Sequence, residues 1–147
     1  MIKYYTKAWH EALVNLVNTS PRFAAEAKKL NGVFVFRILD CPDRKDRMTL
    51  WSFKNGQCVE HVYEAEPAPS ARLREAPFDN NWVMRATCPY PMMAALNRGE
   101  ISPVRALASP QYKVEGKKML VMQMMKAVNS WNEHAASIEC TYEYEAE

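Results

Sequence analysis

The spacing of apolar residues predicts two helices at the start of the chain. One face of the first is outlined by Tyr5, Trp9, Ala12, Leu13 and Leu16. This three-to-four-residue spacing is typical of an amphipathic helix, which we expect over residues 4–17. Ser20–Pro21 is the pattern of an N-cap followed by proline at the first helical position. It predicts a second helix, which the Asn31–Gly32 pair should end.

After Gly32 the pattern becomes typical of β-strands. Residues 32–40, GVFVFRILD, are β-branched, aromatic and apolar on both faces, which predicts a strand. A polar turn over 41–47 follows. Asn55–Gly56 then favours positive φ at both central positions of a tight turn, so we expect a hairpin with strands over 48–53 and 58–64.

The second half of the chain alternates between short helices and strands. Residues 66–81 hold three prolines and show no clean period, which indicates a loop with one helical turn at most. We then expect strands over residues 82–88 and 111–115, and helices over residues 92–97, from Ser102–Pro103 onward, and over 117–135. Side chains alternate between apolar and polar from Ile138 to Glu145, which predicts a sixth strand in the tail, residues 138–147.

These elements predict an α+β fold. The sheet should have five or six strands and be mostly antiparallel, because its neighbouring strands are joined by tight turns. Helices should cover one face of this sheet. A chain of 147 residues is the length of one domain, so we expect a single domain over residues 1–147.

Composition and charge exclude several classes of protein. The net charge of +2 is too small to indicate a nucleic-acid partner. The N-terminal residues lack the pattern of a signal peptide, and no apolar run approaches 18 residues, so we expect no stable membrane insertion. The cysteines, Cys41, Cys58, Cys88 and Cys140, form no CxxC pair, and we expect reduced thiols in a cytoplasmic protein.

Methionines are concentrated in one part of the sequence. Six of the nine lie between residues 92 and 125, and Gln123 is the one polar residue over 119–125. A surface helix needs an apolar face of only about 100°. The additional apolar flank must therefore contact a second layer of the core, a partner chain or a ligand. Methionine is flexible and polarizable, which suits a surface that adapts to more than one shape.

Linked motifs give the chain a resemblance to a known family. Lys113-Val114-Glu115-Gly116 ends a predicted strand and leads into the apolar run MLVMQMM. Upstream, residues 99–106, GEISPVRA, have glycine, an apolar residue, proline and alanine at set positions. The strand WVMRATC and the hairpin TLWSFKNGQCVEHV precede them. In this order and spacing, over roughly residues 24–131, the chain resembles the sterol carrier protein type-two (SCP2) domain, a small lipid-binding α+β fold.

The resemblance implies an apolar tunnel between helices and sheet. By position, its walls would be Trp82, Met84, Met92, Met93, Leu96, Ile101, Val104, Leu107, Met119, Met122 and Met125, with Phe34, Phe36, Trp51 and Phe53 on the sheet side. Which face of the sheet points inward stays open, because the first strand is apolar on both. The sequence departs from the family at Lys117, in the long loop 66–81 and in the tail.

Other candidate chemistry is weaker. Cys58 and His61 lie three apart on a predicted strand, so they should point to opposite faces, and we expect no metal site with Cys88. His10 and His134 have the pattern of surface positions. Another hypothesis is that arginines lie together at the mouth of the cavity and bind an anionic head group. The candidates are Arg72, Arg74, Arg85, Arg98 and Arg105. No motif indicates a catalytic residue or a cofactor.

Three functions are compatible with this pattern. The leading hypothesis is a non-enzymatic carrier that binds a lipid, fatty acyl chain or sterol-like ligand in an internal cavity. The second is an enzyme, or an accessory subunit of one, that acts on a hydrophobic acyl or isoprenoid-like substrate. The third is an interaction module that forms a homodimer by pairing the strand Ile138–Tyr144 with a second copy.

Overall fold

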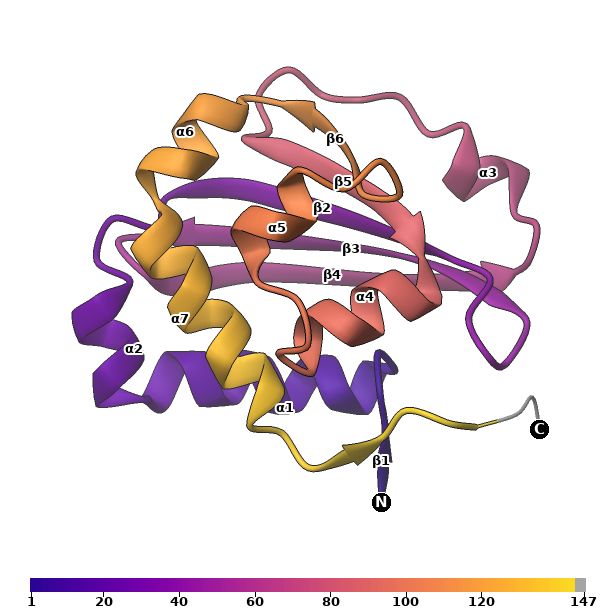
Figure 1. Ribbon diagram of the computed structural model, residues 1–147, viewed down its shortest axis with the longest axis horizontal. Helices are drawn as coiled ribbons and strands as arrows, with labels where there is room; N and C mark the ends of the chain where they lie inside the picture. Colours follow the sequence, from indigo (N-terminus) through magenta and orange to yellow (C-terminus); the bar gives the residue numbers. More distant parts are fainter. Residues whose placement is uncertain (145–147) are drawn as a thin grey trace.

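A five-stranded sheet forms the centre of the computed structural model, which describes residues 1–144 (Figure 1). Its strands are β2 (Gly32–Leu39), β3 (Lys45–Lys54), β4 (Gln57–Pro67), β5 (Met84–Pro89) and β6 (Lys113–Gly116). They lie in the order β4-β3-β2-β5-β6. Three of the four pairings are antiparallel, and β2 pairs with β5 in parallel. The predicted α+β fold with a mostly antiparallel sheet is confirmed.

The β3–β4 hairpin is longer than the sequence predicts. Asn55 and Gly56 have φ of 51° and 83°, as expected for the tight turn that joins Lys54 to Gln57. The strand β3, however, begins at Lys45, inside the predicted polar turn. Asp46 and Arg47 are charged but buried, because each is paired with an opposite charge.

Most of the helices cover one face of the sheet, as predicted (Figure 1). They are α1 (Lys7–Thr19), α2 (Pro21–Glu26), α4 (Tyr90–Asn97), α5 (Pro103–Leu107) and α7 (Met125–Ala136). Ser20 caps α2 by accepting a hydrogen bond from the Phe23 amide at 3.1 Å. The inner face of the sheet carries Phe34 and Phe36, so this is the face that points toward the helices.

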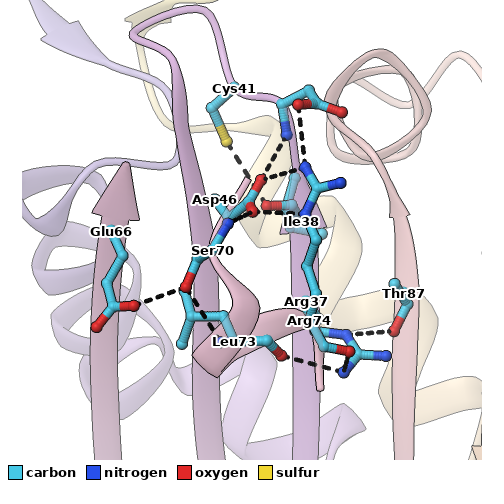
Figure 2. Close-up of polar contacts among 10 residues, drawn as sticks. Arg37, Ile38, Cys41, Asp46, Glu66, Ser70, Leu73, Arg74 and Thr87 are labelled. Carbon is cyan, nitrogen blue, oxygen red and sulfur yellow. Dashed lines mark hydrogen bonds and ion pairs between the residues drawn. The ribbon is translucent and has the colours of Figure 1, made fainter. Parts of the chain in front are cut away.

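The opposite face of the sheet is partly covered by the segment that contains α3 (Ala71–Arg74) (Figure 2). The Arg37 guanidinium donates to the backbone carbonyls of Leu73 and Arg74 at 3.1 and 3.0 Å, and to the Thr87 hydroxyl at 3.1 Å. Val35 and Leu73 are consequently buried on this side. This explains why β2 is apolar on both faces.

Asp46 holds the same segment in place (Figure 2). Its carboxylate is fully buried, accepts hydrogen bonds from the backbone amides of Asp40 and Ser70 at 3.0 and 2.8 Å, and pairs with Arg74 at 2.7 Å. Burial by itself would raise the pKa of this carboxyl. The hydrogen bonds from Arg74, Ser70 and Asp40 outweigh burial and lower the pKa below its usual value.

The prediction of one helix over 117–135 is wrong in one respect, because the structure has two helices there. α6 (Lys118–Gln123) and α7 are separated at Met124, whose φ and ψ are −100° and 15°. α6 contacts the core through Val121, and Met124 at the break is also buried. The additional apolar flank of α6 was expected to contact a second layer of the core, a partner chain or a ligand. Within residues 1–144 of this single chain no second layer covers it: Met119 is 75% exposed and Met122 is 43% exposed.

The tail does not add a sixth strand to the sheet. β7 (Cys140–Thr141) instead pairs in parallel with β1 (Ile2–Lys3), which makes a separate two-stranded sheet within the same chain. The Tyr144 hydroxyl donates to the Tyr4 carbonyl at 2.8 Å. The tyrosines of the tail pack against Tyr4, which precedes α1, and against Tyr90 at the start of α4 rather than on the main sheet. The last part of the predicted tail, residues 145–147, lies outside the described residues.

Candidate ligand-binding cavity

A cavity of about 70 Å³ lies between the inner face of the sheet and the helices. The sheet contributes Phe34, Phe36, Trp51 and Met84 to its walls. The helices and loops contribute Tyr5, Trp9, His10, Leu13, Met93, Leu96, Asn97, Pro103, Leu107, Tyr112, Val121, Val128, Trp131, Asn132 and Ala135. Most of these side chains are apolar, and no charged side chain is among them. The walls of the cavity are therefore suited to an uncharged, mostly hydrophobic ligand.

The Trp131 indole on α7 is the centre of the aromatic wall. Its ring centroid lies 4.9–5.6 Å from the rings of Phe34, Phe36, Trp51 and Phe53. All four arrangements are edge-to-face, which is a favoured geometry for aromatic pairs. These contacts hold α7 against β2 and β3 and fix that side of the cavity.

Seven of the side chains expected in the tunnel line this cavity: Phe34, Phe36, Trp51, Met84, Met93, Leu96 and Leu107. The other eight do not. Phe53 and Met92 are buried elsewhere in the core, and Trp82, Ile101 and Met125 are half-buried away from the cavity. Val104, Met119 and Met122 are exposed, because α6 and one face of α5 lie on the outside of the helical layer.

The first helix and the residue Tyr5 before it contribute walls that the resemblance did not imply. Tyr5, Trp9, His10 and Leu13 line the cavity, although the family-like region was expected to begin near residue 24. The spacing of Trp9 and Leu13 was itself the signal, because it marked the buried face of this helix. Tyr5 was expected in the same helix, over residues 4–17, but α1 begins at Lys7 and Tyr5 precedes it with a φ of 64°. The spacing of apolar residues does not indicate whether the buried face of a helix borders a cavity.

The two helical histidines are buried, which corrects the prediction that they lie at the surface. His10 is 1% exposed and His134 is 4% exposed. Each ring places Nδ1 against the backbone carbonyl four residues earlier: His10 against Thr6 at 2.8 Å, and His134 against Ser130 at 2.6 Å. Burial lowers the pKa of His10 to about 3, so its ring is neutral at physiological pH.

Most other polar groups at the cavity already have partners. The Asn97 side chain accepts a hydrogen bond from the Tyr4 hydroxyl and donates to Asn132 at 2.9 Å. Asn132 in turn donates to the Leu96 carbonyl at 2.8 Å. The Tyr5 hydroxyl lies 3.3 Å from that of Thr49. These bonds join α4 to α7, and the segment before α1 to the sheet, so they hold the walls in place.

The five arginines do not gather at a cavity mouth, and none lines the cavity. Four pair with carboxylates: Arg72 with Glu64 and Glu66, Arg74 with Asp40 and Asp46, Arg85 with Glu115, and Arg98 with Glu100. Arg105 is exposed on α5. This arrangement gives no support to the hypothesis of an arginine clamp for an anionic head group.

The structure offers no metal centre and no activated thiol within residues 1–144. No three side chains of the metal-binding types come together there. All four cysteines are free, and burial raises the pKa of Cys41 and Cys58 to about 11 and that of Cys88 to about 12. Thiols with such pKa values stay protonated and are poor nucleophiles. None of the helices in this part of the chain could cross a bilayer.

Comparisons with known proteins identify the fold. No family model matches the sequence, and no curated protein matches it. Among solved structures, a crystal structure of sterol carrier protein 2 is similar over 93% of this chain and 100% of its own, with 15% identity and a TM-score of 0.72. TT1886 from Thermus thermophilus, described as possibly a sterol carrier protein, is similar over 96% and 93%, with 14% identity and a TM-score of 0.73.

A third similar structure is the palmitated sterol carrier protein 2-like 2 of Aedes aegypti. It matches 84% of this chain and 93% of its own, with 14% identity and a TM-score of 0.50. The sequence identities are only 14–15% although the matches cover 84–96% of this chain, so the similarity is one of backbone architecture. The resemblance noted in the sequence is thus confirmed for the fold, and the chain has the fold of sterol carrier protein 2.

Proposed function

We propose that this protein binds a lipid, fatty acyl or sterol-like molecule between its helices and sheet, and carries it without chemical change. The observation that supports this best is the apolar cavity lined by Phe36, Trp51 and Trp131. The fold supports it too, since the similar structure from Aedes aegypti is described as palmitated. Affinity would come from apolar surface removed from water, at about 25 cal/mol per Å² before the costs of association.

The ligand would have to enlarge the cavity. Its volume of about 70 Å³ is far below the roughly 300–1,000 Å³ of typical ligand pockets. The wall residues Pro103 and Leu107 on α5, and Val128 and Asn132 on α7, are only half-buried. We therefore place the entrance between α5 and α7, where α5 is a short helix of five residues.

An enzymatic role is the second candidate, because His10 is a buried group with a shifted pKa at the cavity. A general base works best when its pKa is near the working pH. The pKa of His10, about 3, makes it a weak base, and its partner at Nδ1 is a backbone carbonyl rather than a carboxylate. These features favour the carrier.

Native mass spectrometry of the freshly purified protein, followed by organic extraction, tests the carrier directly. A retained apolar molecule would support it and reveal the ligand class. A protein that is empty and also fails to bind fluorescent fatty acids would contradict it. The aromatic cavity would then be only an imperfection in the packing of the core.

A larger side chain at the proposed entrance should block binding. We expect Val128→Phe to weaken the binding of a fluorescent fatty acid at least tenfold, while overpacking costs about 1–3 kcal/mol of stability. Val104→Phe is the matched control, because Val104 is 45% exposed on α5 and lies outside the cavity. It should bind like the natural protein. Equal affinity of both variants would show that the ligand does not pass or occupy Val128.

A further inference from the structure

The protonation of the His10 ring follows from its contacts. The Thr6 carbonyl, 2.8 Å from Nδ1, can only accept a hydrogen bond, so Nδ1 must carry the hydrogen. In a neutral imidazole the other nitrogen, Nε2, is then a bare acceptor. Burial keeps the ring neutral at physiological pH, as its lowered pKa shows. His10 therefore presents a lone pair, and that lone pair needs a donor.

No donor within residues 1–144 reaches His10 Nε2, although this atom is buried. The ring lies among aromatic side chains, with centroids 4.4 Å from Tyr5, 5.3 Å from His61 and 5.4 Å from Tyr63. A buried polar atom without a partner is costly, so such atoms are rare and call for an explanation. A second, more open groove lies between α1 and β4, where its walls include Glu11 and His61. Of the residues that the structure describes, His10 is the one that lines both this groove and the apolar cavity.

His134 shows how the same chain satisfies this arrangement elsewhere. It too places Nδ1 against the backbone carbonyl four residues earlier, so in the neutral ring its Nε2 is also an acceptor. The Ser20 hydroxyl lies 2.9 Å from that Nε2 and can donate to it. The Ser20 oxygen accepts in turn from the Phe23 amide. The chain thus supplies a hydroxyl at His134 and leaves the corresponding position open at His10.

We propose that His10 Nε2 accepts a hydrogen bond from the hydroxyl group of the bound ligand, so that the protein prefers apolar molecules that carry an alcohol. This inference rests on the proposed carrier function and specifies its ligand. The head group lies at the end of the cavity next to α1, and the apolar remainder extends along Phe36 and Trp131 toward α5.

The chemistry of Nε2 separates ligand classes. An ester, an ether or an ionised carboxylate can only accept, so each would place a lone pair against a lone pair. Two other buried nitrogens in this part of the chain have no hydrogen-bond partner, Trp9 Nε1 and His61 Nε2. Of these two, only Trp9 also lines the cavity, and its Nε1 is a donor. A hydroxyl both donates and accepts, so it is compatible with either His10 Nε2 or Trp9 Nε1.

Matched ligands test this preference in the full chain. We would measure the affinities of 1-dodecanol and its methyl ether by displacement of a fluorescent fatty acid. The natural protein should bind the alcohol about fivefold more tightly, which corresponds to ~1 kcal/mol. His10→Phe keeps an aromatic ring, and Thr6 O keeps its bond from the His10 backbone amide. This variant should bind both ligands equally.

His134→Phe is the matched control, because it removes a buried imidazole that does not line the cavity. It should retain the preference for the alcohol. If the natural protein binds both ligands equally, or if His10→Phe retains the preference, the assignment of His10 is wrong while the carrier function stands. If neither ligand displaces the probe from any variant, and the probe itself does not bind, the carrier function fails as well.

A spectroscopic measurement keeps the test independent of the variants. In ¹⁵N-labelled natural protein, the His10 Nε2 resonance should have the position of an unprotonated nitrogen. It should shift toward a hydrogen-bonded value when 1-dodecanol is added, and stay in place with the methyl ether. A proton found on Nε2 in the free protein, or a resonance that 1-dodecanol leaves unmoved at saturation, would overturn the proposal.

Discussion

Trp131→Ala is expected to lower the free energy of unfolding by about 4 kcal/mol. The substitution removes an indole that packs edge-to-face against Phe34, Phe36, Trp51 and Phe53. The cost has two parts, the apolar surface returned to water and the larger cavity left between α7 and the sheet. Since small domains are stable by only about 5–15 kcal/mol, much of the total would be lost. Urea denaturation followed by circular dichroism would measure it.

The control for this variant is Asn129→Ala, on the exposed face of the same helix. It should change the stability by less than about 0.5 kcal/mol. A loss below about 1 kcal/mol for Trp131→Ala would mean that α7 packs on the sheet through other contacts. The aromatic wall described above would then contribute little to the fold.

Asp46→Asn should cost about 3 kcal/mol at pH 7. The amide cannot replace the carboxylate that pairs with Arg74 and accepts from the amides of Asp40 and Ser70. Because the native pKa of Asp46 lies below the unfolded one, its contribution is present above about pH 4 and is lost as the pH falls through the native pKa. The difference between the natural protein and the variant should therefore shrink in acid.

Urea titrations at pH 7 and pH 3 would measure this difference. Asp40→Asn is the matched control, because its carboxylate pairs with the same arginine but is 72% exposed. Exposed pairs contribute at most about 1 kcal/mol. Equal losses for the two variants would contradict the view that buried Asp46, rather than the Arg74 pairing in general, holds α3 on the sheet.

The sequence predicted the fold best where the structure is decided locally. Asn55–Gly56 accepts positive φ at little cost, and Ser20–Pro21 matches an N-cap in any context, so the hairpin turn and the start of α2 were both predicted correctly. Sequence periodicity could not show that the helix over 117–135 breaks at Met124. The break is a tertiary effect, because residues on both sides of it are good helix formers.

The residues of the candidate site could be predicted only in part, because local sequence patterns do not report tertiary contacts. Apolar spacing marks which residues are buried, but not which buried residues border a cavity. The sequence pattern therefore does not distinguish Phe36 and Trp51, which line the cavity, from Phe53, which is buried in the core outside it. The sequence pattern predicts a surface position for His10, because polar side chains are usually exposed. Its burial instead depends on the aromatic side chains of β3 and β4. No local pattern reports such contacts.

The division of the methionines between surface and core gives the protein an unequal sensitivity to oxidants. Met119 and Met122 on α6 are open to peroxide, and their conversion to sulfoxide would add polar oxygens only where water already lies. Met84 and Met93 are buried and line the cavity, where a sulfoxide would disrupt the packing. The exposed pair can thus react first and consume oxidant before the interior is damaged.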